Sequence, residues 1–337
     1  MIRRPPRSTL DRSSAASDVY KRQDIYLHRT LNILRNEGVN PTVVFEFKPI
    51  QKGVFCGIKE ARILLSKILP ETGIEVWTVD EGTELNQDEV ALRIKAPYGS
   101  IGLYTSTISG ILSSSTGWAT AANQCVKAAN NIPVISTSST YIHPNVASNL
   151  DYASIIGGCI ACSTTLGAKL AGVTPLGNIP HSLSLILGDT IKAMHAFDKH
   201  MPQDVPRIAL IDTFKDEAEE ALNVSEEFKE TIRGICIDTP KTRGGPSPQL
   251  IKEIRTRLDI AGFHHVEIIV AGELTPEIIS NFIQENTPVT SFNISQYIAQ
   301  APTIPFHHEI HEINGHPIAR RGYLPGITSN TQLDRIM

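Results

Sequence analysis

The sequence has no apolar run long enough to span a bilayer, and neither sign of charge dominates it. The formal net charge of -4 provides no basic surface for nucleic acid or for an acidic membrane, so we expect neither as a partner. Five cysteines are too few, and odd in number, for a disulfide framework, which favours a reducing cytoplasm. With 41% hydrophobic and 20% charged residues, the composition is that of a globular protein.

The first 23 residues are rich in arginine and serine and lack hydrophobic periodicity. A transit peptide or a disordered basic tail has such a composition. The segment also resembles the translation of a sequencing-adapter read-through, and on this interpretation the natural chain begins near Asp24. We therefore assign residues 1–23 no function and expect them to be disordered.

The remaining chain is long enough for two domains. Residues 24–105 mix the two periodicities, with helices expected at 25–37 and 58–68 and strands at 42–47 and 83–96. Residues 106–302 begin with a long helical stretch and then alternate strand and helix, including a helical pattern over 181–197. Residues 303–337 read as a β-rich return segment with a hairpin turn at Asn314-Gly315, and we expect them to complete the N-terminal domain.

Three short apolar runs in the second half end in polar or glycine residues and are followed by helical patterns. They are 208–211 before Asp212, 234–237 before Asp238, and 266–270 before Ala271-Gly272-Glu273. Strands that recur about every 25 to 30 residues indicate βα units. Since parallel strands of an α/β barrel present functional groups at their C-terminal ends, the pattern favours an enzyme that handles phosphates or sugars.

Asp212 and Asp238 are the first candidate site residues. Carboxylates at strand ends can hold ribose hydroxyls or a Mg²⁺ ion that bridges a diphosphate, although either acid could instead cap the following helix. The loop from Asp238 to Gly245 combines an acid, cations and glycines, so Arg243 could bind phosphate or the loop could be an ordinary turn. His181 could be a general acid/base, a phosphate acceptor or a structural hydrogen-bonding residue.

Two further patterns favour ordinary structure over metal binding. Cys159 and Cys162 have the Cys-x-x-Cys spacing, but no second pair lies nearby, so we expect two small buried residues. The histidines at 307, 308, 311 and 316 do not form His-Glu-x-x-His, and we expect a solvated strand-and-turn surface there. We therefore predict no resident metal site.

Many short segments, in order, resemble the nicotinate phosphoribosyltransferases, which are type II phosphoribosyltransferases. The resemblance runs from about Asp24 to about Thr328. The segments are Asp24-Ile25-Tyr26, residues 53–57, residues 117–122, His143-Pro144, Gly157-Gly158-Cys159, residues 166–170, Pro180-His181-Ser182, Gly188-Asp189-Thr190, Asp212-Thr213-Phe214, Asp238-Thr239-Pro240 and Arg320-Arg321-Gly322.

The resemblance implies an irregular α/β barrel with an N-terminal α/β sandwich domain. It also implies an enzyme of NAD salvage that joins nicotinate and phosphoribosyl pyrophosphate, with Mg²⁺, to give nicotinate mononucleotide and pyrophosphate. Many members couple the reaction to ATP hydrolysis through a phosphohistidine, and His181 falls on that position. Asp238 falls on the acid that holds the ribose, and Asp212 on another acid of the site. The other residues expected to bind substrate are Tyr26, which reaches a neighbouring subunit of a homodimer with shared sites, Lys169, Arg243, Gly272, Ser295 and Thr140.

The chain departs from the family pattern at several positions. Thr137 and Thr140 stand where an aromatic residue and an arginine are expected, and Cys236 stands in place of another arginine. Thr105 replaces a glutamate, while Glu273, Asn293 and Ser295 interrupt two glycine-rich segments that bind the 5′-phosphate in the family. These departures give a second interpretation, a catalytically impaired paralogue that binds a nucleotide or regulates a partner. The retained Asp212 and Asp238, with Arg243, His181 and Tyr26, favour the enzyme.

Overall fold

The structure is a computed structural model that describes residues 21–337. The chain divides into an N-terminal unit, which ends at Gly117 and includes Pro302–Met337, and a barrel unit, Trp118–Ala301. The predicted disorder of residues 1–23 falls mainly outside the described residues. Gln23 is described and is buried, and its Nε2 donates to Thr107 Oγ1 at 2.5 Å, so the expected disorder does not extend to this residue.

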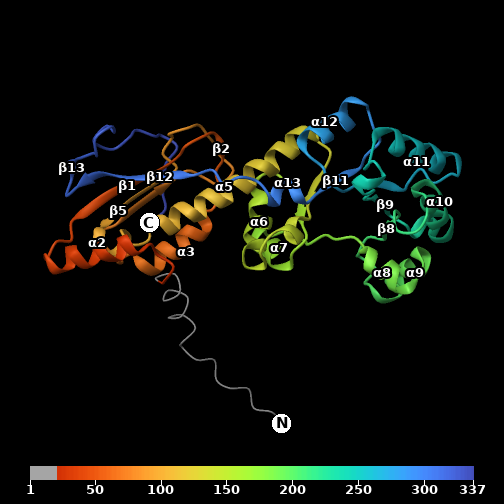
Figure 1. The fold of residues 1–337 in the computed structure, drawn as a ribbon, viewed down its shortest axis with the longest axis horizontal. Helices are drawn as coiled ribbons and strands as arrows, with labels where there is room; N and C mark the ends of the chain where they lie inside the picture. The colour runs from red at the N-terminus through yellow and green to blue at the C-terminus, as the bar shows by residue number, and fades with distance from the viewer. Residues whose placement is uncertain (1–20) are drawn as a thin grey trace, which may run out of the picture. The chain divides into compact units, whose positions relative to one another are not determined.

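The N-terminal unit is built on a six-stranded sheet with the order β13-β12-β1-β5-β3-β14, in which neighbouring strands are antiparallel. Its elements are α2 (Ile25–Asn36), β1 (Thr42–Pro49), β2 (Gly53–Val54), α3 (Ile58–Ile68), β3 (Glu75–Thr78), β4 (Glu84–Leu85), β5 (Leu92–Pro97), α4 (Tyr98–Ile101), β12 (Phe306–Ile313), β13 (His316–Pro317) and β14 (Asp334–Arg335). The C-terminal segment thus supplies three strands of this sheet (Figure 1).

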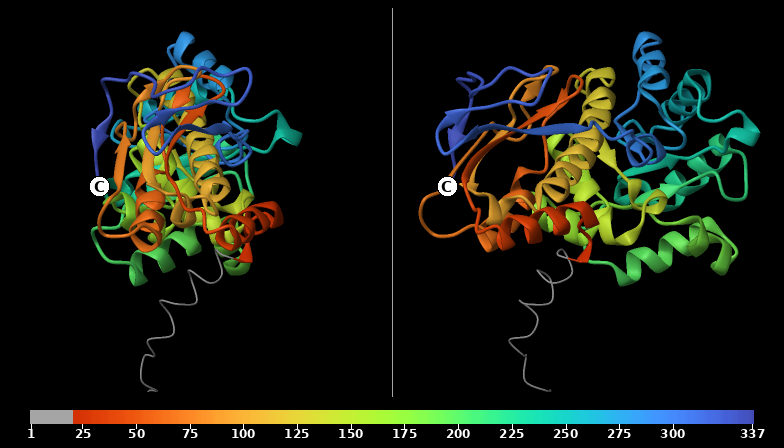
Figure 2. Two further views of the ribbon diagram at one scale, coloured as in Figure 1. Left: turned by 90° about the vertical axis from the view of Figure 1, so that its left-hand side faces the viewer. Right: turned by 60° about the vertical axis from the view of Figure 1, so that its left-hand side comes forward.

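The core of the N-terminal unit forms because alternate residues of the strands are apolar. Val76 of β3 and Ile94 of β5 are buried together with Ala61 and Leu65 of α3, which lies along the sheet (Figure 2). The stretch 83–96 is not one strand: β4 and β5 are separated by a turn in which Asp88 has a φ of 62°. The hairpin at Asn314-Gly315 is confirmed, since both residues have the positive φ of a type I′ turn, 52° and 78°.

The barrel unit contains a six-stranded parallel sheet with the order β7-β6-β11-β10-β9-β8. Its strands are β6 (Val134–Ser136), β7 (Ala161–Cys162), β8 (Ile208–Leu210), β9 (Gly234–Ile237), β10 (Glu267–Val270) and β11 (Ser291–Ile294). Within the described residues no pairing joins β7 to β8, so the strands form an open half-barrel. The predicted α/β class with an irregular barrel is confirmed, and the barrel is a half-barrel.

Helices connect these strands. They are α5 (Thr105–Ala128, which begins in the N-terminal unit), α6 (Pro144–Ile156), α7 (Thr165–Ala171), α8 (His181–Leu187), α9 (Thr190–His200), α10 (Glu217–Phe228), α11 (Pro248–Ile260), α12 (Pro276–Gln284) and α13 (Gln296–Ala299), with 3₁₀ turns at Ser138–Tyr141, Lys229–Thr231 and Lys241–Arg243. The helical pattern over 181–197 is broken into α8 and α9. Gly188 ends α8 with a φ of 74°, and Asp189 caps α9 by accepting from Lys192 N at 2.8 Å.

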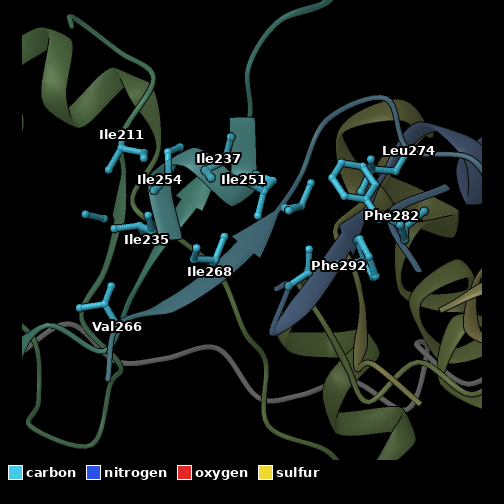
Figure 3. Close-up of a cluster of buried hydrophobic side chains, with 14 of the residues drawn as sticks. Ile211, Ile235, Ile237, Ile251, Ile254, Val266, Ile268, Leu274, Phe282 and Phe292 are labelled. Atoms are coloured by element: carbon cyan, nitrogen blue, oxygen red, sulfur yellow. The ribbon is translucent and has the colours of Figure 1, made fainter. Parts of the chain in front are cut away.

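Strand alternation separates the two faces of the half-barrel sheet. Ile235 and Ile237 of β9 and Ile268 of β10 pack on the outer helices, where they meet Ile251 of α11 and Phe282 of α12 (Figure 3). The residues that alternate with these along the strands, which include Cys236 of β9 and Ile269 of β10, point to the opposite, inner face. There they form a small apolar cluster with Leu210 of β8. This alternation decides which side chains can reach the inside of the half-barrel.

Candidate functional site

A cavity of about 980 Å³ lies in the barrel unit, at the carboxyl ends of the strands. The alternation of each strand continues into it. Asp212 comes two residues after the inner-face Leu210, and Asp238 comes two residues after the inner-face Cys236. In the same way β11 directs Asn293 and Ser295 to the cavity, while its Phe292 and Ile294 lie in the outer core. The acids meet because β8 and β9 are adjacent and in parallel register, with Leu210 opposite Cys236.

His181 joins the two acids from the first turn of α8. Its Nδ1 is 3.0 Å from Thr213 Oγ1, and its Nε2 is 3.5 Å from Asp212 Oδ2. The Asp212 side chain is only 2% exposed, whereas that of His181 is 39% exposed. The hydroxyl of Thr213 orients the imidazole, so the second ring nitrogen faces the carboxylate and the ring remains accessible from the cavity.

Both acids ionise less readily than ordinary carboxylates. Burial raises the pKa of Asp212, the charge of Glu217 raises it further, and His181 opposes the shift. Burial also raises the pKa of Asp238, again with a contribution from the neighbouring Asp212 and an opposing one from His181. Asp212 Oδ1 is buried and has no hydrogen-bond partner. A buried carboxylate oxygen without a donor is costly, which suits a hydroxyl or a cation brought by a ligand.

Gly272 makes room for Asp238. It follows β10 with a φ of 107°, and a Cβ atom there would lie 3.3 Å from Asp238 Oδ1. A side chain would therefore be strained and would crowd the carboxylate. The expected position of Gly272 in the site thus has a steric reason.

The part of the cavity next to β6 and β11 is polar but uncharged. Thr137, Thr140, Asn293 and Ser295 line it. Asn293 is 5% exposed, and its Oδ1 is buried without a hydrogen-bond partner. The cavity therefore has an acidic part at β8 and β9 and a part with hydroxyl and amide groups at β6 and β11.

The structure brings six of the nine predicted site residues to this cavity: His181, Asp212, Asp238, Thr140, Gly272 and Ser295. The other three do not line it. Arg243 Nη2 instead lies 3.1 Å from Glu217 Oε2, Lys169 is exposed on α7, and Tyr26 is 57% exposed on α2 of the N-terminal unit. Among the substituted positions Thr137, Cys236, Glu273 and Asn293 also line the cavity, whereas Thr105 is buried in the N-terminal unit.

Sequence reasoning did not select several lining residues as site residues, among them Tyr141, Lys241 and Asn178. Tyr141 is the one aromatic side chain on the lining within residues 21–337, and Lys241 is the one lysine or arginine there. Asn178 is a polar residue three positions before His181. Tyr141 and Lys241 each follow a strand by a few residues, as Asp212 does, and that position was a usable signal.

Two predictions about metal-like patterns have different outcomes. Cys159 and Cys162 are buried and free, as predicted. The prediction of a solvated surface for the histidines is wrong for His311, which is 5% exposed because its Nδ1 bonds Gly326 O at 2.8 Å. His308 stacks on Phe47, with ring centroids 5.5 Å apart. In the described part of the chain, no group of three or more His, Cys, Asp or Glu side chains could hold a metal ion, and no helix could cross a membrane.

Comparison with known proteins gives a consistent assignment. Family models for the N- and C-terminal domains of quinolinate phosphoribosyl transferase match residues 24–116 and 118–308. The crystal structure of a nicotinate-nucleotide pyrophosphorylase from Pyrococcus furiosus superposes with a TM-score of 0.85 at 33% identity, over 97% of this chain and 82% of that one. Human nicotinic acid phosphoribosyltransferase has a TM-score of 0.72 at 17% identity over 91% and 77% of the two chains, a likeness of fold alone.

A nicotinate phosphoribosyltransferase of Mycobacterium tuberculosis is 25% identical over 235 residues, which are 68% of this chain and 49% of the relative. The chain thus spans about half the length of the curated relatives it matches. The resemblance found in the sequence is confirmed by the domain models, which together cover most of the chain. The chain therefore belongs to the quinolinate phosphoribosyl transferase family and has the type II phosphoribosyltransferase fold.

Proposed function

We propose that this chain transfers a phosphoribosyl group from phosphoribosyl pyrophosphate to nicotinate, and so serves pyridine nucleotide and NAD biosynthesis. The observation that carries the proposal is the grouping of His181, Asp212 and Asp238 around one cavity, with Asp212 Oδ1 buried and unpartnered. Family membership supports the reaction class. The interpretation as an impaired paralogue is not favoured, since the acids remain at the ends of β8 and β9.

In this reaction the bond between ribose C1 and the diphosphate oxygen breaks, and a bond from C1 to the pyridine nitrogen forms. The electron pair of the broken bond leaves with pyrophosphate, so the ribose becomes cation-like in the transition state. Asp212 and Asp238 are positioned to accept hydrogen bonds from ribose hydroxyls and to stabilise this charge. The low exposure of the Asp212 side chain, 2%, strengthens its effect, because little water competes with it.

Mg²⁺ enters as part of the substrate, bound to the diphosphate. The carboxylate oxygens of Asp212 and Asp238 are ligands of the type that Mg²⁺ takes, usually one or two from the protein together with phosphate oxygens and water. His181 fits a role as phosphate acceptor from ATP, because Thr213 holds one ring nitrogen and the ring is accessible. Its replacement by alanine is expected to abolish stimulation of turnover by ATP.

The charge of the cavity favours nicotinate over quinolinate. The described lining holds one lysine, Lys241, against the three acids Asp212, Asp238 and Glu273. Lys241 is itself 83% exposed and lies 3.9 Å from Glu273. Quinolinate carries a second carboxylate, which would need a further buried cation to offset its desolvation.

We further propose a cytoplasmic homodimer with shared sites. The five cysteines are free and buried, which suits a reducing compartment. Tyr26 is exposed on α2, where a second copy could receive it. Analytical ultracentrifugation and activity of mixed Tyr26→Ala and Asp238→Asn chains test this, since only mixed dimers would restore an intact site.

The test of function uses protein lacking residues 1–20, so that the buried Gln23 is kept. Phosphoribosyl pyrophosphate with Mg²⁺ is titrated calorimetrically, and mononucleotide formation is then followed with nicotinate and, separately, with quinolinate. We expect micromolar binding and turnover of nicotinate at least about tenfold above that of quinolinate. Faster turnover of quinolinate would refute the assignment of substrate. A folded protein that binds no phosphoribosyl pyrophosphate would refute the reaction itself.

A further inference from the structure

Glu217 is a buried carboxylate close to the cavity but not on its lining. It is the first residue of α10 and is 2% exposed. Its Oε1 accepts from Thr239 Oγ1 at 2.9 Å, and its Oε2 accepts from Arg243 Nη2 at 3.1 Å. Both donors belong to the loop that follows β9, so one residue of a helix holds two points of a neighbouring loop.

That loop, residues 238–246, forms much of one cavity wall. Besides Asp238, it contributes Thr239, Lys241 and both glycines to the lining. Its internal hydrogen bonds, such as Arg243 N to Pro240 O at 2.8 Å, shape a turn without attaching it to another element. Gly244 and Gly245 have φ values of 100° and 74°, a conformation that glycine adopts readily, and no side chain at these two positions helps to hold the loop. The bonds to Glu217 attach the loop to α10.

We infer that Glu217 is a positioning residue for the transfer reaction, which holds the loop after β9 so that Asp238 and the adjacent wall meet the substrate in a fixed geometry. This inference rests on the proposed function. It also explains Arg243. The guanidinium neutralises a buried carboxylate, since an unpaired charge there would be strongly unfavourable, and so fixes the loop instead of lining the cavity.

Glu217 has a second influence, through its charge. The titratable groups that face Asp212 are His181 from α8, Cys236 from β9, Glu217 from α10 and Asp238 from the loop after β9. The carboxylate of Glu217 is one of the causes that raise the pKa of Asp212, after burial. Removing its charge makes Asp212 easier to ionise, so the pKa of Asp212 falls. If Asp212 acts as the carboxylate, the acidic limb of turnover then moves to lower pH.

The test compares Glu217→Gln and Glu217→Ala with Glu220→Gln. Glu220 is a matched control, because it is 4% exposed on the same helix and bonds Lys215 N at 3.2 Å, away from the loop. Glu217→Gln keeps an acceptor for Thr239 but loses the charge. In Glu217→Gln we expect the KM for phosphoribosyl pyrophosphate to rise about tenfold and the acidic limb of turnover to move to lower pH. In Glu217→Ala we expect kcat/KM to fall about 100-fold. Adding Arg243→Gln to Glu217→Gln should change these kinetic parameters little further, because the two side chains act as one pair.

Hydrogen exchange tests the anchoring of the loop by Glu217 separately from the proposed function. In Glu217→Ala the backbone N–H groups of Thr239 and of residues 241–245 should exchange at least about tenfold faster, with no such change in Glu220→Gln. A folded Glu217→Ala protein with wild-type exchange and wild-type kinetics would overturn the positioning role. If the wild type turns over neither pyridine, the proposed function fails, and unchanged exchange would then refute the anchoring independently.

Discussion

Glu46 of the N-terminal unit and Asp212 of the barrel unit both have buried carboxylates, and their surroundings affect these two groups in opposite ways. In the N-terminal unit the side chain of Glu46, on β1, is fully buried, with Arg93 Nε 2.9 Å from Oε1 and Lys48 Nζ 3.0 Å from Oε2. Although burial opposes ionisation, hydrogen bonds from Lys48, Thr328 and Arg93 lower the pKa of Glu46. In the barrel unit Asp212 is nearly as buried, but burial raises its pKa and no lysine or arginine bonds it in the described chain.

The difference separates structure from function. Glu46 joins β1 to the C-terminal segment, because Thr328 N donates to its Oε1 at 3.0 Å and Lys48 bonds the Thr328 side chain at 2.8 Å. These contacts stabilise the fold, because ion pairs with Lys48 and Arg93 offset the charge of Glu46, although its Oε2 accepts no hydrogen bond. The cavity acids have poor partners within the chain, so folding gains little from them, and their hydrogen-bonding capacity remains for a substrate.

Substitution of Asp238 gives the strongest test of this distinction between structural and functional acids. We expect Asp238→Asn to lower kcat/KM by at least about 100-fold, because the amide cannot supply negative charge to a cation-like ribose. Stability should be unchanged or higher, since the surroundings of Asp238 disfavour its charged form. The measurement pairs steady-state kinetics with urea unfolding. Asp151→Asn is the control, a fully buried acid of the same unit that does not line the cavity and bonds Thr164 Oγ1 at 2.7 Å. A loss of stability with full activity in Asp238→Asn would contradict the distinction.

Glu46→Gln should show the reverse pattern. The substitution leaves Lys48 and Arg93 with no anion in a buried position, so the free energy of unfolding should fall by about 3 kcal/mol. Turnover by the molecules that remain folded should change less than about threefold. Glu75→Gln is the matched control on the same sheet, because its pair with Lys95 at 2.9 Å is exposed and should contribute under about 1 kcal/mol. Equal losses in the two variants would show that the Glu46 network does not stabilise the unit.

The same contrast predicts opposite dependence on pH. The lowered pKa of Glu46 means that its contribution is present above the ordinary carboxylate pKa of about 4.3 and is lost as pH falls through the folded value. The raised pKa values of Asp212 and Asp238 destabilise the ionised folded state, an effect that grows as pH rises above about 3.9. Relative to wild type, a protein with both Asp212→Asn and Asp238→Asn should therefore gain stability between pH 4 and pH 7, as measured by urea unfolding. If the difference in stability between this variant and wild type did not change with pH, the raised pKa values of Asp212 and Asp238 would be refuted.

Sequence patterns predicted one side of this comparison and not the other. Asp212 and Asp238 could be placed because each follows a short apolar strand, and parallel strands end at a common edge. The Glu46 network could not, since Thr328 and His311 lie far along the chain and nothing local marks them as its partners. Arg243 was assigned to phosphate for the same reason: its pairing with Glu217 depends on how α10 lies beside the loop, which periodicity does not specify.

Glu273 gives the smallest effect and refines the comparison. It lines the cavity as the aspartates do, but its side chain is 61% exposed and Lys241 is 3.9 Å away. Since water screens such a pair, Glu273→Gln should change stability by less than about 0.5 kcal/mol. It should lower the KM for phosphoribosyl pyrophosphate only about twofold, because one screened negative charge near the diphosphate is removed. The KM at low and high salt is the measurement, and Glu285→Gln, whose exposed acid pairs with Lys252 at 3.0 Å outside the cavity, is the control. A loss of activity as large as that of Asp238→Asn would mean that burial does not distinguish functional acids in this cavity.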